Sequence, residues 1–427
     1  MIDALRNAMR LPDLRNKILF TLGILIVYRL AAHIPVPGVD PQALATMFQS
    51  NQLLGFLDLF SGGALSNFSV VAMGVYPLIT AQIIMQLATG VVPQLERMMK
   101  EEGEKGRAKV NQWTHYMTVP LAALQGYGQA FVLTQSNPPV LTNFGFDKDP
   151  LTTLSVLATL TGGTIFAIWL GELISEQGIG SGISIIIFGG IVAGIPQRVG
   201  QMLQTNPIQF IFFLGITVIT IIGIIYIQEG HRRIPVQYGK RVRGNKVFGG
   251  QSTHIPLRIN SSGMIPLIFA ISILIFPGVL AAPFAAPPGQ PENLANWVVN
   301  AFNQQSVVYW LAYFVMVIGF TYFYTDVIFR QQNLPEVLQQ QGGFIPGIRP
   351  GKKTEDYLNS VLQRITFVGA IFLGLVAVLP FLIRDPNEST TMLITSTGLL
   401  IVVGVVLDTM KQLQAQLVMR HYEGFIK

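Results

Sequence analysis

The amino-acid sequence predicts an all-α polytopic membrane protein, and its composition is the first observation behind that prediction. Half of the 427 residues are apolar and only 12% are Asp, Glu, Lys or Arg, whereas about 25% of the residues in a typical soluble domain are charged. Mean hydropathy is +0.49. So few charges cannot cover the surface of a water-soluble protein of this length. The abundance of Ile, Leu, Val and Phe also excludes a disordered chain.

Ten apolar segments are the second observation. A membrane-spanning helix needs about 20 predominantly apolar residues, and segments near that length recur along the whole chain. The basic residues before the first segment could begin a cleaved signal peptide, but the nine segments that follow favour a first helix that is retained. We place the segments at residues 18–34, 73–92, 114–134, 154–173, 183–195, 209–228, 263–282, 307–328, 365–383 and 392–410.

The distribution of Lys and Arg is the third observation, because the cytoplasmic loops of membrane proteins carry an excess of these residues. Of the 28 Lys and Arg residues, 24 lie in the N-terminal segment, the C-terminal tail and every second loop. The alternate loops hold three, and Arg29 lies inside the first span. This asymmetry predicts that both termini are cytoplasmic, which requires an even number of spans and agrees with ten.

The spans divide the chain into an N-terminal half, residues 1–200, and a C-terminal half, residues 201–427, with five spans each. Because five is odd, the halves enter the membrane from opposite sides, as the inverted repeats of transporters do. Two cytoplasmic loops, at about 229–262 and 329–364, are unusually long. Alternating residues at 234–238 and 246–248 predict a short β-hairpin in the first loop.

The length of these two loops needs an explanation of its own, since loops this long are usually functional or disordered. Their aromatic residues and turn signals favour the docking of a cytoplasmic partner. Their basic residues alone are also explained by membrane topology and by attraction to anionic lipids.

Several kinds of chemistry are missing from the sequence. The chain has no cysteine and therefore no disulfide, thiolate nucleophile or Cys-bound metal. It has no His-Glu-x-x-His motif and no Walker A sequence. No span carries an ionisable residue at its centre, which argues against proton coupling and against an intramembrane protease. We therefore expect no metal, no cofactor and no enzymatic activity, with any work supplied from outside the chain.

One segment outside the ten spans is unusual. Residues 61–74 are moderately apolar, are bracketed by glycines and precede the second span. As a helix they would extend about 21 Å, too short to cross roughly 30 Å of hydrocarbon. Two interpretations stay open: a half-buried loop helix, or a re-entrant helix within a cavity, where such backbone must line protein or water.

Long stretches of the sequence closely resemble the SecY family, the large subunits of bacterial protein-conducting channels. The two main signatures are FSGGALSNFSVVAMGVYPLITAQI at 60–83 and WLGELISEQGIGSGISIIIF at 169–188. QSTH at 251–254, FIPGIRPG at 344–351 and residues 399–408 are also similar. The match runs along essentially the whole chain. It implies two inverted five-helix halves around a central pore, with a lateral gate and a re-entrant plug helix at about 61–71.

The resemblance assigns roles to particular residues. The pore ring would consist of branched apolar side chains, which pass any polypeptide and favour dewetting when the pore is empty: Ile79, Ile83, Ile183, Ile187, Ile268 and Ile401. The plug would include Ser61, Gly62, Gly63, Ala64, Leu65, Ser66, Asn67 and Phe68. Gln86 and Asn260 would lie near the lateral gate, between the second, third, seventh and eighth spans. Cytoplasmic partners would dock on Arg232, Arg233, Lys240, Arg241, Arg243 and Arg349.

The resemblance also implies partners: the small membrane subunits SecE and SecG, the SecA ATPase, the ribosome, signal peptides and nascent polypeptides, and anionic lipids, but not DNA. The expected location is the cytoplasmic (inner) membrane. The expected function is translocation of unfolded, signal-bearing polypeptides and lateral release of apolar segments into lipid. The alternative is a secondary transporter with inverted repeats, which would need discrete polar ligands near the midplane. An intramembrane enzyme is disfavoured by the missing catalytic groups.

Overall fold

The computed structural model describes residues 9–423, except 51–57, 59–60, 135–138, 142–143, 206, 239–240, 244–245, 249–251, 282–283, 285, 287–292, 303–305, 333 and 383–395. The chain forms two compact units. Unit 1 comprises Met1–Leu214, Ser272–Tyr309 and Thr391–Lys427, and unit 2 comprises Gly215–Ile271 and Trp310–Thr390. Each unit is described separately below.

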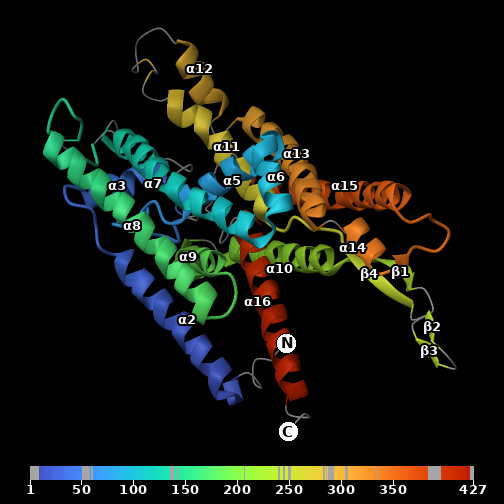
Figure 1. Cartoon of the computed structure of the whole chain (residues 1–427). Helices are drawn as coiled ribbons and strands as arrows, with labels where there is room; N and C mark the ends of the chain where they lie inside the picture. The colour runs from blue at the N-terminus through green and yellow to red at the C-terminus, as the bar shows by residue number, and fades with distance from the viewer. Residues whose placement is uncertain are drawn as a thin grey trace. The chain divides into compact units, whose positions relative to one another are not determined.

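A helix lies at every one of the ten predicted segments, so the expectation of a mostly helical chain is confirmed (Figure 1). Five of the helices (α8, α10, α13, α15 and α16) are long and apolar enough to cross a membrane, within the part of the chain that is described. The pair α5 and α6 counts as a sixth if it forms one bent span. The ten helices are α2 (Pro12–Ala31), α5 (Tyr76–Val91), α7 (Glu104–Thr134), α8 (Pro150–Gln177), α9 (Gly182–Thr205), α10 (Pro207–Glu229), α11 (Ile265–Ala281), α13 (Val307–Gln332), α15 (Lys352–Leu382) and α16 (Ser396–Glu423).

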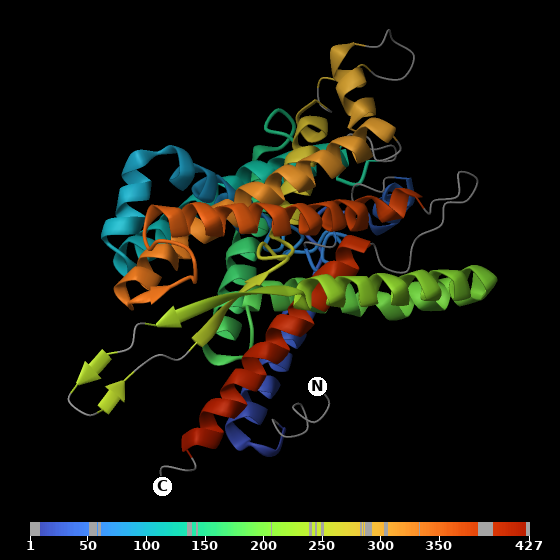
Figure 2. The same cartoon turned by 90° about the vertical axis from the view of Figure 1, so that its right-hand side faces the viewer.

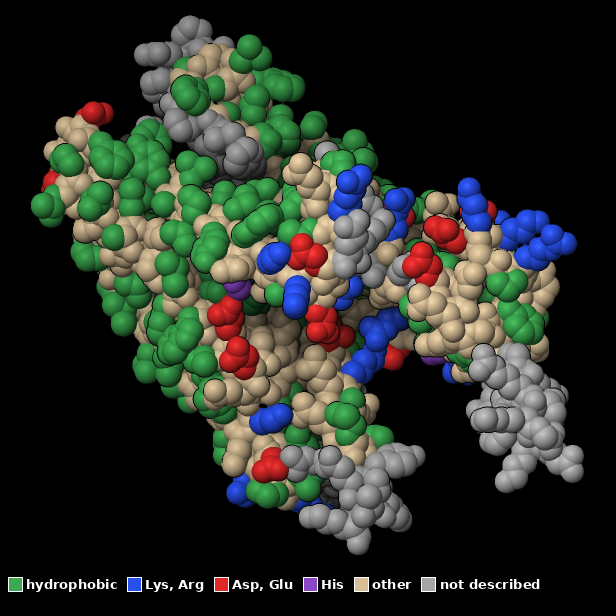
Figure 3. Space-filling model, viewed as in Figure 1, with side chains coloured by type: hydrophobic (Ala, Val, Ile, Leu, Met, Phe, Trp, Pro, Cys, Tyr) green, Lys and Arg blue, Asp and Glu red, His purple; other side chains and the backbone are tan. Residues whose placement is uncertain are grey.

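Several helices are longer than the apolar segments that predicted them. The helix α7 begins at Glu104, ten residues before its apolar segment, and α15 begins at Lys352, thirteen residues before its own. These added turns are polar, and an apolar count detects only the part of a helix that suits hydrocarbon. In Figure 3, hydrophobic side chains dominate the surface over α3 (Pro41–Ser50), α7 and α8 of unit 1, as expected for a face that meets lipid.

The second span ends in a sharp bend. The helix α5 runs from Tyr76 to Val91, and α6 (Pro93–Glu101) continues at 91° to it. Val92 between them is extended, with φ −93° and ψ 109°. Pro93 explains the break, because proline has no N–H to donate and drives the residue before it out of the helical region.

Glycines allow the helices of unit 1 to pack closely. A Cβ on Gly182, the first residue of α9, would lie 1.8 Å from the carbonyl oxygen of Gly171 in α8. The N–H of Gly182 also donates to Ser175 Oγ of α8 at 2.9 Å. The short α8–α9 turn packs in turn on α2 and α16, where Leu14, Ile179 and Leu413 form a buried cluster.

Unit 2 contains a small antiparallel sheet in the order β4–β1–β5, formed by β1 (His231–Tyr238), β4 (Ser252–Arg258) and β5 (Gly343–Phe344). The two inward side chains of β1, at positions 234 and 236, are buried on the helices α14 (Leu334–Gln340) and α15. The buried members of this cluster, called the sheet cluster below, are Ile234, Val236, Leu257, Phe329, Leu338, Ile345, Leu358 and Leu362.

The predicted pairing within the first long loop is wrong in one respect. A hairpin is present, and Figure 2 shows it beyond the ends of β1 and β4, but it is formed by β2 (Arg241–Arg243) and β3 (Lys246–Phe248). Residues 234–237 pair with β4 instead, and Tyr238 pairs with Gly343 of β5. Two residues, Gly and Asn in the sequence, separate β2 from β3, a connection that favours pairing of immediate neighbours.

Candidate functional site

Residues 61–75 lie within unit 1 as a chain of turns, and the expected regular plug helix is absent from them. Backbone bonds from Phe68 N to Leu65 O and from Ala72 N to Ser69 O, both 2.8 Å, close single turns. The φ angles of Gly62, Gly63 and Phe68 are +65°, +80° and +39°. A right-handed helix cannot contain these positive angles, which explains the difference from the prediction.

The base of this segment is organised by Asp58 and Ser61. The hydroxyl of Ser61 accepts hydrogen bonds from the backbone N–H groups of Ala64 and Leu65, at 3.2 and 3.0 Å. The carboxylate of Asp58 accepts one from the N–H of Ser66 at 2.8 Å. These bonds satisfy backbone donors that a helix would satisfy internally, as buried donors require.

Three side-chain hydrogen bonds and a short backbone ladder attach the segment to α2 and the residues after it. Tyr28 Oη donates to the carbonyl of Ser61, and Arg29 Nη1 donates to the carbonyl of Gly62 at 3.1 Å. Further along, Asn67 Nδ2 donates to the carbonyl of Ala32 at 3.3 Å. The backbone of 34–36 pairs with 68–70, through Val36 N to Phe68 O (3.0 Å) and Val70 N to Ile34 O (2.9 Å).

The other side of the segment fits against glycines of α8 and α9. A Cβ on Gly163 would lie 1.8 Å from Val70 O, and one on Gly190 would lie 1.9 Å from Gly62 Cα. Ala64 and Phe68 are fully buried, whereas Ser66 is exposed. The segment therefore fills a closely matched space among α2, α8 and α9.

Five of the six predicted pore-ring residues belong to unit 1. Ile79 and Ile83 on α5, Ile187 on α9 and Ile401 on α16 are buried, between 1 and 6% exposed. Ile183 is half-buried, and its Cγ1 would be 3.5 Å from a Cβ on Gly171 of α8. The helices α9 and α16 contact each other. Ile268 is also buried but belongs to unit 2, so a closed ring remains a prediction.

The two predicted gate residues differ in their surroundings. Gln86 is half-buried on α5. Asn260, in unit 2, is 6% exposed and is held just before α11. There its Nδ2 donates to Gly263 O at 3.1 Å and its Oδ1 accepts from Ser262 Oγ at 3.0 Å.

A polar contact joins α5 and α7 and was not predicted from the sequence. Gln125 Nε2 of α7 donates to Thr80 Oγ1 of α5 at 3.2 Å. Among the described residues, the buried carbonyl oxygens of the Gln125 and Gln129 side chains find no hydrogen-bond partner. The signal that could have found them is two glutamines four residues apart in an apolar span, and therefore on one helix face.

The described members of the predicted docking set lie in unit 2, in or near its strands. Arg232 and Arg233 are exposed on β1, and Arg349 is exposed in the turn before α15. The carbonyl of Arg349 accepts from Thr354 Oγ1 at 2.9 Å, which ties this turn to the start of α15. Arg241 and Arg243 belong to β2, and Lys240 lies outside the described residues.

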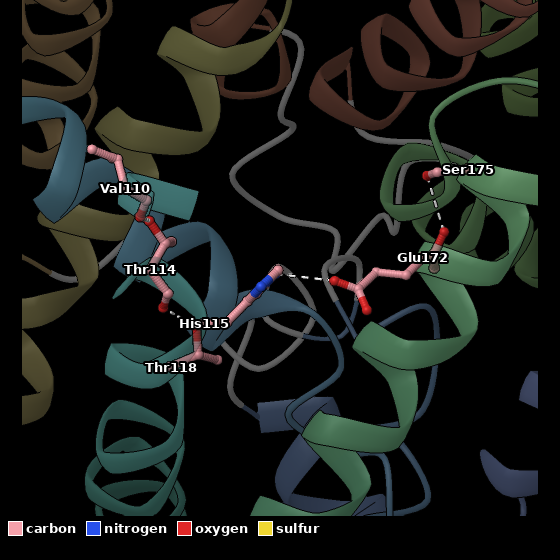
Figure 4. A network of polar contacts seen from close by, with 7 residues as sticks. Val110, Thr114, His115, Thr118, Glu172 and Ser175 are labelled. Carbon is pink, nitrogen blue, oxygen red and sulfur yellow. Dashed lines mark hydrogen bonds and ion pairs between the residues drawn. The ribbon is translucent and has the colours of Figure 1, made fainter. Parts of the chain in front are cut away.

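An ion pair between α7 and α8 was also not predicted from the sequence (Figure 4). His115 Nε2 lies 3.3 Å from Glu172 Oε1. Both side chains are partly exposed, so the pair contributes little stability on its own. Elsewhere in the described part of the chain, no group of three or more His, Asp or Glu side chains is arranged to hold a metal ion.

Known proteins resemble this chain along its whole length. The SecY family model matches residues 69–410. The chain belongs to the SecY family. The protein translocase subunits SecY of Halalkalibacterium halodurans and Thermotoga maritima are 45% and 43% identical to it. The matches cover 100% of this chain and 100% and 98% of those relatives.

Solved structures with the same fold are more distant in sequence. One described as the structure of a protein-conducting channel has a TM-score of 0.66 at 18% identity, covering 94% of this chain and 92% of that one. Sec61 in a canine ribosome–channel complex from the endoplasmic reticulum has a TM-score of 0.64 at 18% identity, with the same coverage. The predicted SecY-family fold, a multi-pass helical membrane protein, is therefore confirmed.

Proposed function

We propose that this SecY-family chain is the channel-forming subunit of a protein translocase. It passes unfolded, signal-bearing polypeptides across the cytoplasmic membrane and releases apolar segments sideways into lipid. The observation that carries the proposal is segment 61–74, a mostly buried, non-helical stretch that packs on glycines of the two long helices α8 and α9. Non-helical backbone at membrane depth is tolerated only inside protein or beside water, which suits a removable plug.

In this proposal, the plug and the isoleucine ring seal the resting channel together. Branched apolar side chains bind no particular substrate, so they let diverse residues pass, and an empty apolar constriction tends to dewet and block ions. The buried isoleucines on α5, α9 and α16 support this role. The chain would act by binding and gating, with no covalent chemistry.

Opening follows from a difference in contacts. A signal helix that binds better to the open state shifts the population toward it. We place this contact at the lateral gate, near Gln86 and Asn260, between the proposed halves 1–200 and 201–427. The contact of Gln125 with Thr80 lies on the same pair of helices, α5 and α7, as the proposed gate.

The energy for transport would come from partners that dock on unit 2. The exposed Arg232, Arg233 and Arg349 stand on or beside a sheet with its own buried core, which is a firm base for a contact. Ribosomal RNA phosphates attract such residues. The SecA ATPase would supply the work, since the sequence contains no Walker A motif. SecE and SecG would complete the complex in the inner membrane, with both termini cytoplasmic.

A disulfide experiment tests the proposal, because the chain has no native cysteine. Ile83→Cys gives the protein a single thiol, and a secretory polypeptide with one cysteine is stalled during transport. We expect a crosslink from Ile83→Cys and none from the lipid-facing control Ile219→Cys, whose side chain is 71% exposed on α10. Absence of a crosslink from positions 83, 187 and 401, together with saturable uptake of a small solute, would favour the secondary transporter.

A further inference from the structure

Arg29 is a charged residue inside the first span that none of the roles above explains. Charged groups within spans are costly and usually face a functional partner. Arg29 is half-buried, and its guanidinium reaches the proposed plug segment, where Nη1 donates to Gly62 O at 3.1 Å. A Cβ on the next residue, Gly63, would lie 3.0 Å from the same nitrogen.

Tyr28, beside Arg29, points to the same place. Its ring is 1% exposed and its hydroxyl donates to the carbonyl of Ser61, immediately before Gly62. The ring also lies 3.0 Å from the position of a Cβ on Gly62. Two adjacent side chains of α2 therefore hold two consecutive carbonyl groups at the base of the plug.

We propose that Tyr28 and Arg29 form a latch that holds the plug closed through the carbonyls of Ser61 and Gly62. They are positioning residues in the channel proposed above, and the inference rests on that function. Both bonds end on backbone carbonyls, so the latch is insensitive to the side chains that the plug carries. Each such bond contributes only modestly in a folded protein, so an arriving signal helix can release it.

The glycines opposite the latch explain why its bonds decide where the plug sits. Gly190 of α9 contacts the Cα of Gly62 so closely that no side chain fits between them. The Ser61–Gly62 backbone thus lies between α2 and α9, held by donors on one side and by a bare helix surface on the other. Without the donors, nothing described on the α2 side replaces the bonds to these two carbonyls.

Two measurements on the reconstituted translocase, containing the full chain, test the latch. One is the ion conductance of resting channels. The other is the rate at which a water-soluble maleimide modifies the single thiol of Ala64→Cys, whose side chain is fully buried while the plug is seated. We expect Tyr28→Phe and Arg29→Ala each to raise the labelling rate about tenfold, the change that about 1.4 kcal/mol produces.

Matched variants separate a latch from general damage to the fold. Arg29→Lys keeps a cationic donor and should return both readings most of the way to the parent level. Tyr226→Phe removes the same hydroxyl from a tyrosine that is 77% exposed on α10, and should change neither reading. Deletion of residues 62–70 should raise the conductance at least as much as either latch variant.

The outcomes distinguish the latch from the channel function on which it rests. If the deletion leaves the resting conductance unchanged, segment 61–74 is not a seal and the proposed function fails with it. If the deletion raises the conductance while Tyr28→Phe and Arg29→Ala match the Tyr226→Phe control, the plug is real and the latch is wrong. If Arg29→Lys behaves like Arg29→Ala, a donor role for Arg29 is refuted.

Discussion

Two adjacent glycines of α8, Gly162 and Gly163, provide a sharp test of how the proposed plug is seated. A Cβ on Gly163 would lie 1.8 Å from the carbonyl oxygen of Val70, whereas no described atom lies within 4 Å of a Cβ on Gly162. Both are interior positions of one helix. Replacement by alanine therefore brings the same gain in helix propensity, about 1 kcal/mol, to both variants.

The two variants therefore differ only in the steric cost of the added methyl group. The contact at Gly163→Ala must open from 1.8 Å to at least 3.0 Å, and the atom that must move is backbone. Overpacking of this kind costs about 1–3 kcal/mol. If the plug segment gives way rather than the helix, the ratio of seated to unseated plug falls by about five- to more than a hundredfold.

Resting ion conductance of the reconstituted complex measures this ratio. We expect Gly163→Ala to leak at least several-fold more than the parent protein and Gly162→Ala to leak no more than the parent. Equal conductance of the two variants, in complexes that assemble to the same yield, would refute the inference that α8 seats the plug.

Other predictions concern the rest of the fold. Hydrogen bonds from the Thr152 side chain and backbone hold the pKa of the Asp149 carboxyl below its ordinary value at the start of α8; Asp149→Ala should therefore lower the unfolding temperature at neutral pH, and the difference should vanish as the pH falls through that lowered pKa. Leu358→Ala, at a fully buried position of the sheet cluster, should lower the free energy of unfolding by about 2–5 kcal/mol and speed proteolysis of both long loops. Gly182→Ala should lower thermal stability in detergent, because it closes on α8. Arg349→Glu, at an exposed position, should weaken binding to ribosomes or SecA, measured by co-sedimentation. The loss should be strongest at low salt, and the unfolding temperature should not fall.

The helices were predictable because hydrocarbon imposes a simple rule on composition. Every apolar segment became a helix, since a chain in lipid must satisfy its backbone groups internally. The same rule could not predict the polar turns at the ends of these helices. The segment that begins α7 at Glu104 is as polar as a loop, so a count of apolar residues does not detect it.

The plug could be located from the sequence, but its conformation could not. Bracketing glycines and insufficient length set residues 61–74 apart as unusual, and the resemblance to the SecY family then implied a plug at about 61–71. The positive φ of Phe68 and the bonds from Tyr28 and Arg29 depend on residues more than thirty positions away. The contact of Gln125 with Thr80 and the pairing of β1 with β4 likewise depend on distant partners.

The small sheet of unit 2 has a consequence for protein engineering. Its middle strand comes from the first long loop and its edge strand β5 from the second, where Gln237 pairs with Phe344. The buried cluster beneath it also draws on both loops. The two loops therefore fold together as one structural unit, although they are separate in the sequence. A chimera that takes one loop from a relative must therefore take the other loop as well. Otherwise β1 would pair with a strand of different sequence, and the side chains of the buried cluster would no longer fit one another.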